Sequence, residues 1–392
     1  MIDPQIFIAA VKGALARGGI SPDAPVSLYE PMFGEAEVAA VSECVRSGWV
    51  SSAGAAVDSF EARLRDVTGA AHVTTCVNGT AALHIALMLA GVGPGDEVIV
   101  PALTFVATAA AVRYCGAVPH FVDVTSEDFG MDPVQLESHL NVTAERRGDV
   151  LVNRFTGRRI AAILPVHCFG YLCRIEEILE LANRRGLPVV EDAAEALGTR
   201  LAGRAAGTFG LLGTLSFNGN KIITTGGGGA IMTADPALAA RAKHLTTTAK
   251  VPHRWAFRHD MLGYNYRLPS LNAALGMAQL DRFERILQRK RKLHDAYRCV
   301  FRQMSGVSLL EGRAGTRPNH WLNTIVLPGT LSSRDRLIEA AHAEGVLVRP
   351  VWDLLPTLPH FADCPHDAFS TARDFADRTI SLPSSEFLGA DL

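Results

Sequence analysis

Two patterns of apolar residues alternate through the first two-thirds of the chain. Short apolar runs indicate buried strands, and longer segments with an apolar residue at every third or fourth position indicate helices with one buried face. The clearest helical pattern has Ile175, Ile178, Leu179 and Ala182 on one face and stops at Gly186. Alternating strands and amphipathic helices predict a mostly parallel sheet that helices cover on both faces. The predicted strands are residues 97–100, 120–124, 161–166 and 187–190, and residues 104–115 form the predicted helix after the first strand.

The pattern changes after Pro269, where a long helical stretch reaches about Met304. A smaller α+β unit follows, with strands predicted at 322–327 and 346–351 and a helix at 334–343 between them. We therefore expect two packed domains. Residues 1–268 would form a large α/β domain with an N-terminal helical segment, and residues 269–392 an interdomain helix and a small α+β domain. Residues 151–160 look like an inserted hairpin with a Thr-Gly turn, to which we assign no function.

Polar side chains follow three of the predicted strands. Thr104, His167 and Asp192 each come directly after an apolar run. Ligands of parallel α/β sheets bind at the carboxyl ends of the strands. We therefore expect one crevice to collect these three residues.

The segment from Ser216 to residue 230 is the most unusual part of the sequence. Lys221 lies five residues after Ser216 and is followed by four consecutive glycines at 226–229. A lysine that forms a Schiff base must be held rigidly, partly desolvated, and near a backbone that can approach a flat cofactor. Asp192 offers a carboxylate for a pyridinium nitrogen, and Gly79 and Thr80 offer N–H groups for a phosphate at a predicted helix start. Together these groups predict pyridoxal 5'-phosphate (PLP) as the cofactor.

Composition and charge favour an ordinary globular enzyme over other classes of protein. The net charge of −2 over 392 residues gives no electrostatic reason to expect a nucleic-acid or anionic-membrane partner. No apolar run approaches the roughly 20 residues of a membrane span, and the N-terminus lacks the pattern of a signal peptide. The seven cysteines show no zinc-type spacing. We expect free thiols, no metal, and a cytoplasmic location.

Six segments, in order, resemble the DegT/StrS-type PLP-dependent nucleotide-sugar aminotransferases, and the resemblance runs from about Tyr29 to Ser385. It implies a fold-type I PLP-dependent transferase and a homodimer with shared active sites. Members of this family that dehydrate rather than transaminate carry histidine at the position of Lys221, so the lysine favours amino transfer. The matching segments are residues 48–54, 78–80, 101–105, 191–196, 216–230 and 263–269.

The resemblance also implies roles for the residues around the cofactor. Lys221 would bind it covalently and move a proton, and Asp192 would pair with its ring nitrogen. Glu195 occupies a position that is often glutamine and would lie beside the phenolic oxygen. A negative charge there would raise the pKa of Glu195 or require another donor.

Three further residues complete the expected cofactor site. Ser216 would add a hydroxyl to the phosphate site of Gly79 and Thr80. Asn265 would reach the phosphate from the neighbouring subunit. Phe105 matches the position of a ring that stacks on the cofactor, although on sequence alone it could equally be core.

Two regions point to the substrate. Trp49 and Ser51 lie in a loop that resembles the nucleotide-diphosphate loop of the family. Segments 319–321 and 348–352 supply His320, Arg349 and aromatic residues that could meet a sugar diphosphate. The planar fork of Arg349 suits a diphosphate because it binds two oxygens at once. Packing beside strands is an equally good explanation for each of these residues.

The branch of the family most similar to the chain aminates C4 of UDP-linked 4-keto-6-deoxy-N-acetyl sugars on the way to bacillosamine or legionaminic-acid-type products. This rests on segments 245–255, 348–352 and 382–385. The amine donor would be L-glutamate, in a ping-pong Schiff-base cycle. Alternatives are a GDP- or dTDP-linked sugar, amination at C3, and a non-catalytic PLP-binding regulator. A dinucleotide-binding dehydratase is rejected because the glycines at 226–229 lie after the lysine and not at the first strand-to-helix turn.

Overall fold

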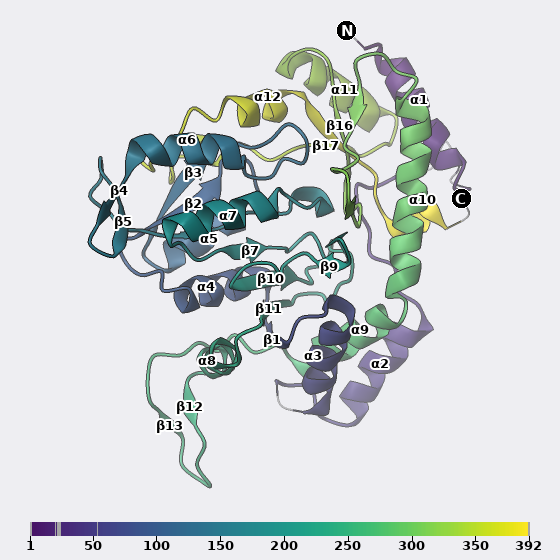
Figure 1. Cartoon of the computed structure of the whole chain (residues 1–392). Coiled ribbons are helices and arrows are strands. Elements are labelled where there is room, and N and C mark those ends of the chain that lie inside the picture. The colour runs from purple at the N-terminus through teal and green to yellow at the C-terminus, as the bar shows by residue number, and fades with distance from the viewer. Residues whose placement is uncertain (1, 20, 22–24, 53, 391–392) are drawn as a thin grey trace.

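The computed structural model describes residues 2–19, 21, 25–52 and 54–390. The larger part of this chain is built around a central sheet (Figure 1). The strands of this sheet are β1 (His72–Cys76), β2 (Glu97–Pro101), β3 (Val118–Val122), β6 (Ile160–Ile163), β7 (Val190–Asp192), β10 (Leu212–Ser216) and β11 (Gly229–Thr233). They lie in the order β3-β2-β6-β7-β10-β11-β1. Isolated parallel bridges between Ile163 and Val189 and between Val166 and Asp192 connect the β6 segment to the β7 segment. Neighbours are parallel from β3 to β10, whereas β11 runs antiparallel to β10 and β1. The prediction of a mostly parallel α/β sheet is confirmed.

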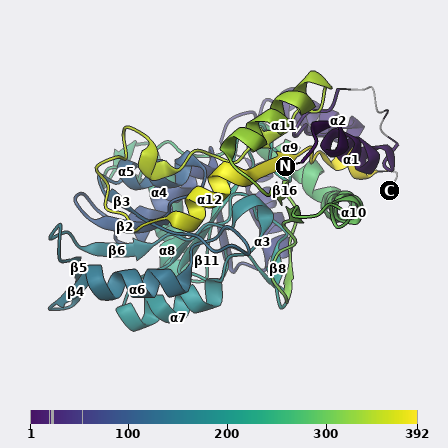
Figure 2. The same cartoon turned by 90° about the horizontal axis from the view of Figure 1, so that it is seen from above.

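Helices cover both faces of this sheet (Figure 2). The helices on one face are α4 (Gly79–Leu89), α5 (Val106–Tyr114) and α8 (Pro236–Thr246), and those on the other are α6 (Pro133–Thr143) and α7 (Ile175–Arg185). The five strand residues of β2 and of β3 are all buried, as expected for a sheet covered on both sides. Gly186, in the left-handed conformation at φ 70°, ends α7 where the sequence predicts.

A second apolar core lies beside the sheet domain, and the N-terminal helix belongs to it. Helix α1 (Pro4–Ala16) packs against α10 (Phe283–Phe301) and α11 (Leu331–Ala343). Phe7 and Val11 of α1 are fully buried there with Leu293 and Ile325. The N-terminal helix therefore packs with the C-terminal unit and not with the rest of the predicted unit 1–268, because the C-terminal unit buries its apolar face.

The C-terminal unit also contains a small antiparallel sheet in the order β14-β16-β18-β17. The strands of this sheet are β14 (Ser308–Leu309), β16 (Asn323–Val326), β17 (Arg349–Pro350) and β18 (Thr379–Leu382). Helix α12 (Ser370–Arg378) directly precedes β18. The strand predicted at 346–351 is thus confined to two residues. The helical stretch predicted after Pro269 is two helices, α9 (Ser270–Asp281) and α10, which meet at Arg282. Helix α9 packs against α2 (Glu35–Arg46) and α3 (Ala55–Thr68).

Short hairpins complete the described chain. The remaining strands are β4 (Ala144–Arg147), β5 (Val150–Asn153), β8 (Arg200–Leu201), β9 (Arg204–Ala205), β12 (Lys250–Val251), β13 (Arg258–His259) and β15 (Thr316–Arg317), and the 3-10 turns are Cys168–Gly170, Leu355–Thr357 and Glu386–Gly389. The β12–β13 hairpin projects away from the sheet domain (Figure 1). No helix among the described residues is long and apolar enough to span a membrane, and those residues contain no cluster of His, Cys, Asp and Glu suited to a metal ion.

Candidate active site

A cavity of about 370 Å³ lies at the carboxyl edge of the central sheet. Its walls come from the segments that follow β1, β2, β6, β7 and β10, as expected for a parallel α/β sheet. Trp321 and Trp352 close it from the C-terminal unit. Seven of the residues predicted to bind the cofactor line this one cavity: Gly79, Thr80, Phe105, Asp192, Glu195, Ser216 and Lys221.

One end of the cavity is the N-terminus of α4. The Asn78 side chain caps this helix by accepting a hydrogen bond from the Ala81 N–H at 2.8 Å. The next residues, Gly79 and Thr80, carry N–H groups of the first turn, which have no partner within the helix. Ser216 lies so close that a Cβ on Gly79 would be 2.8 Å from its Cβ. Helix start and hydroxyl together can hold a phosphate.

The last of the four consecutive glycines explains part of that unusual run. A Cβ on Gly229 would lie 2.5 Å from the Asn78 carbonyl oxygen and 2.7 Å from the Gly79 nitrogen. Glycine therefore lets β11 pass directly beneath the start of α4. The position of the phosphate cradle depends on this close approach.

Replacing Gly229 by alanine is expected to displace the start of α4 and weaken cofactor binding. Overpacking of this kind costs about 1–3 kcal/mol of stability. Thermal denaturation and the rate of cofactor loss on dialysis would measure both effects. Gly219→Ala, in the lysine segment, is the matched control because nothing lies within 4 Å of its added Cβ. Equal behaviour of the two variants would contradict the role of Gly229.

Asp192 ends β7 and faces into the cavity. Its Oδ2 accepts a hydrogen bond from the Thr108 hydroxyl at 2.8 Å, and its Oδ1 accepts one from the Ala194 N–H at 3.1 Å. Burial raises the pKa of Asp192, and the two hydrogen bonds and the charge of Lys221 offset this only in part. A cation bonded to the carboxylate would offset the remaining cost, and a protonated ring nitrogen supplies one.

Lys221 and Glu195 lie next to each other in the wall of the cavity. The Lys221 Nζ lies 3.4 Å from Glu195 Oε1, and the lysine side chain is only 11% exposed. Glu195 Oε2 accepts a hydrogen bond from the Phe169 N–H at 2.8 Å. Tyr29 fixes the lysine backbone by donating its hydroxyl to the Lys221 carbonyl at 2.7 Å. Burial raises the pKa of Glu195, against the opposing charge of Lys221.

This raised pKa gives the cofactor-free protein a pH-dependent stability. The folded protein keeps a proton on Glu195 at pH values where the unfolded chain has lost it, so its stability falls as pH rises through that range. Glu195→Gln lacks this loss. We therefore expect its stability relative to the wild type to increase with pH, from the usual range of a glutamate pKa up to the raised pKa. Thermal denaturation between about pH 4 and pH 8 would measure it. Exposed Glu43→Gln is the control, and a difference that does not change with pH would contradict the prediction.

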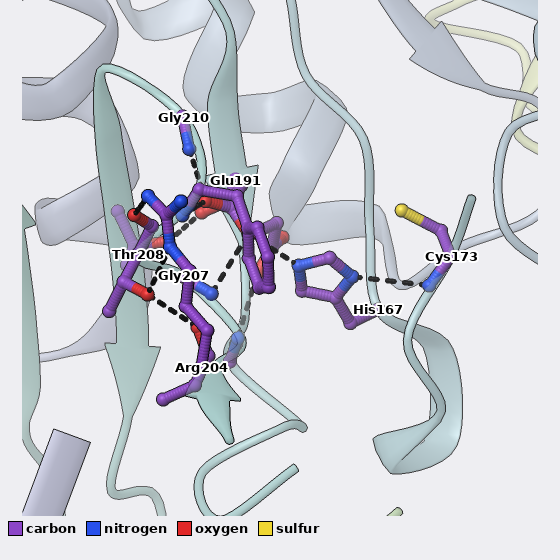
Figure 3. A network of polar contacts seen from close by, with 12 residues as sticks. His167, Cys173, Glu191, Arg204, Gly207, Thr208 and Gly210 are labelled. Atoms are coloured by element: carbon purple, nitrogen blue, oxygen red, sulfur yellow. Dashed lines mark hydrogen bonds and ion pairs between the residues drawn. The ribbon is translucent and has the colours of Figure 1, made fainter. Parts of the chain in front are cut away.

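His167 does not join the cavity, so the expectation that one crevice collects Thr104, His167 and Asp192 is wrong for the histidine. Glu191 and Asp192 are neighbours on a strand and point to opposite faces. His167 lies on the Glu191 face: its Nε2 is 2.9 Å from Glu191 Oε2, and its Nδ1 accepts a hydrogen bond from the Cys173 N–H at 3.4 Å (Figure 3). Glu191 also accepts hydrogen bonds from the N–H groups of Gly207, Phe209 and Gly210.

Asn265 does not line the cavity of its own chain either. It is exposed, and its Oδ1 accepts hydrogen bonds from Arg267 Nε at 3.1 Å and Nη2 at 2.9 Å. It follows the projecting β12–β13 hairpin. The role predicted for it belongs to a neighbouring subunit and stays a prediction.

The residues predicted to bind the substrate lie outside the cavity. Trp49 is 64% exposed and lines a separate groove of about 750 Å³ beside α2, α3 and α9. The carbonyl of Ser51 accepts the Ser270 N–H at 2.7 Å. Arg349 is exposed on β17. His320 is buried and stacks on His294 with ring centroids 3.9 Å apart, so packing explains this residue.

Other side chains reach the cavity instead. Trp321 is next to His320 in the chain, and Trp352 lies three residues after Arg349. Both segments stand out in the sequence, but the predicted binding residues are His320 and Arg349 and not these two tryptophans. Thr108, the hydroxyl donor to Asp192, was missed. Its position four residues after Thr104, at the start of a helix, is the only signal that could have found it.

Fold and site together define a PLP-dependent aminotransferase, since a lysine, a buried carboxylate and a helix N-terminus converge at the carboxyl edge of a parallel sheet. Residues 31–391 match the DegT/DnrJ/EryC1/StrS aminotransferase family, and the chain belongs to that family. The resemblance seen in the sequence is confirmed at this level.

Known proteins similar to the chain agree with this assignment. GDP-perosamine synthase of Caulobacter vibrioides is 36% identical, covering 92% of this chain and 93% of the relative. A UDP-N-acetyl-3-dehydro-alpha-D-glucosamine 3-aminotransferase of Acidithiobacillus ferrooxidans is 32% identical over 83% and 82%. The PLP form of Spr1654 from Streptococcus pneumoniae superposes with a TM-score of 0.82 at 25% identity, covering 92% of this chain and 94% of that one. The protein is a PLP-dependent sugar aminotransferase.

Proposed function

We propose that the protein transfers an amino group from L-glutamate to C4 of a nucleotide-linked 4-keto-6-deoxy sugar. The observation that carries the proposal is the convergence of Lys221, Asp192 and Glu195 in one cavity of a DegT-family chain. A dehydratase of the resembling family would carry histidine in place of Lys221. A non-catalytic regulator would have no need of a lysine whose amine lies 3.4 Å from a buried carboxylate.

Each residue has a distinct task in this proposal. When bound, PLP acts as an electron sink for the carbon that loses or gains the amine. Asp192 would hold a proton on the ring nitrogen, and the first turn of α4 with Ser216 would hold the phosphate. Lys221 would attach the cofactor and, when free, carry the proton between the two carbons. Phe105 lines the same cavity and would pack against the cofactor there.

Two nucleotides compete for the substrate role. The segments noted in the sequence favour UDP-2-acetamido-2,6-dideoxy-4-ketohexose. The similarity to GDP-perosamine synthases, at 36%, 35% and 34% identity for three relatives, favours a GDP-linked sugar. The amino transfer itself is the same for both, so the residues that carry it do not choose between them.

A half-reaction separates these substrates. Protein treated with L-glutamate and freed of it by gel filtration carries the amino group on the cofactor. UDP-, GDP- and dTDP-linked 4-keto-6-deoxy sugars are then added singly, and the visible cofactor band is followed. Return of the band with one sugar identifies the nucleotide. No return with any of them would overturn the proposed acceptor, and failure of glutamate to remove the band would overturn the donor.

We also propose that two chains share their active sites. Trp255, Phe257 and Leu262 on or beside the β12–β13 hairpin are 77%, 83% and 80% exposed, which favours their burial by a second copy. Asn265 follows this hairpin and would then reach the partner's phosphate site. Sedimentation equilibrium tests the proposal: a monomer at assay concentration would overturn it.

A further inference from the structure

The amine of Lys221 lies against the face of Trp321. Its Nζ is 4.0 Å from the centre of the indole ring. The indole Nε1–H donates a hydrogen bond to the backbone oxygen of Asn220 at 2.6 Å. One side chain from the C-terminal unit therefore contacts both the end of the lysine and the peptide just before it. Indole is the aromatic group that attracts a cation most strongly.

Trp321 is itself held in place from behind. The Asn319 Oδ1 accepts the Trp321 N–H at 2.8 Å, and the Asn319 amide donates to the Glu195 carbonyl at 2.8 Å. The buried Lys290 donates to the Trp321 carbonyl at 2.7 Å. Trp321 is 3% exposed. The indole is thus a fixed surface, tied through Asn319 to the backbone of Glu195.

Glu195 completes the surroundings of the amine. Its Oε1 lies 3.4 Å from the Lys221 Nζ. The amine therefore has a carboxyl group on one side and an aromatic face on another, in a place largely closed to water. An aromatic face attracts an ammonium ion and not a neutral amine.

We propose that Trp321 is a positioning residue whose indole face holds the Lys221 ammonium ion between the two proton transfers of the amino-transfer cycle. The inference rests on the role proposed above for Lys221. During amino transfer the free lysine takes a proton from one carbon and delivers it to another. The ring keeps that proton on Nζ, and keeps Nζ within the cavity, between the two transfers.

Two variants and two readouts test the proposal. Trp321→Leu removes the ring, and Trp321→Phe keeps a smaller aromatic face. Trace acetic anhydride labels only uncharged amines, so labelling of Lys221 in cofactor-free protein at neutral pH is expected to rise about 3- to 10-fold in Trp321→Leu and less in Trp321→Phe. Mass spectrometry measures the labelling. The rate at which L-glutamate removes the visible band of the PLP-loaded protein is expected to fall about 10-fold in Trp321→Leu.

The pH dependence of the labelling separates this role from mere shielding of the amine. If the ring only kept the reagent out, its loss would raise labelling by the same factor at every pH, whereas loss of its attraction for the ammonium ion lowers the pH at which labelling begins. Trp352→Leu is the matched control, because its ring lines the same cavity and stacks on Phe169 as that of Trp321 does, whereas the Lys221 amine lies over the ring of Trp321. Labelling in Trp321→Leu or Trp321→Phe that does not exceed that of Trp352→Leu would overturn the proposal. Covalent PLP binding by Lys221→Ala would instead overturn the role of Lys221.

Discussion

Lys221→Ala is expected to lose the visible band of the bound cofactor and to lower turnover at least about 10³-fold, since it removes both the covalent attachment and the proton carrier. Lys221 is the lysine in the cavity of the described chain, and its backbone is fixed by Tyr29 and by the turn from Asn218. Absorbance after PLP loading and a coupled assay for 2-oxoglutarate release measure the two losses.

Lys243→Ala is the matched control for this substitution. Lys243 pairs with Glu61 at 2.8 Å on the surface and is 45% exposed, so its loss removes a lysine without touching the cavity. Its spectrum and turnover should equal those of the wild type. If Lys221→Ala kept the band and more than about a tenth of the turnover, another amine would have to carry the chemistry, and the proposed site would be wrong.

The cofactor site could be predicted because its residues follow strands and open helices in a fixed order along the chain. Lys221, Asp192 and Gly79 each carry local signals: a glycine run, a carboxylate after an apolar run, and a helix start. A parallel sheet then brings strand ends to one edge whatever their separation in sequence. Seven predicted residues accordingly line one cavity.

Side-chain direction could not be predicted in the same way. His167 follows a strand as Asp192 does, yet it pairs with the buried Glu191 on the opposite face. In segment 319–321, His320 adopts a positive φ of 51°, which sends its ring to His294 while Trp321 turns to the cavity. A backbone conformation rare for a non-glycine residue leaves no mark in the amino-acid order.

Contacts between distant segments could not be predicted from the sequence for a different reason. Helix α1 has an ordinary buried face, and nothing in its sequence says that α10 and not the sheet domain buries it. Asn265 is a stronger case, because its predicted partner would be a second chain. The loop at Trp49, which was predicted to bind the substrate, likewise lies off the cavity of a single chain.

Asp192→Asn is expected to lower turnover at least about 10²-fold, the loss typical of removing one preorganised electrostatic partner of the reacting group. Asparagine keeps the shape of the side chain: its oxygen can accept the hydrogen bond from the Ala194 N–H while its amide donates to the Thr108 hydroxyl. It cannot hold a proton on the ring nitrogen, so the electron sink is weakened. The covalent band through Lys221 should persist, which separates this defect from that of Lys221→Ala.

The stability of the cofactor-free variant supplies the second half of this test. Burial raises the pKa of Asp192, which means that the folded apo-protein is penalised when this carboxyl ionises. Asparagine removes that penalty, so apo Asp192→Asn should unfold at or above the wild-type temperature near neutral pH while its turnover collapses. Thr108→Val, which removes only one donor, should lose far less turnover. A parallel loss of stability and activity in Asp192→Asn would show that the carboxylate holds the fold and not the cofactor.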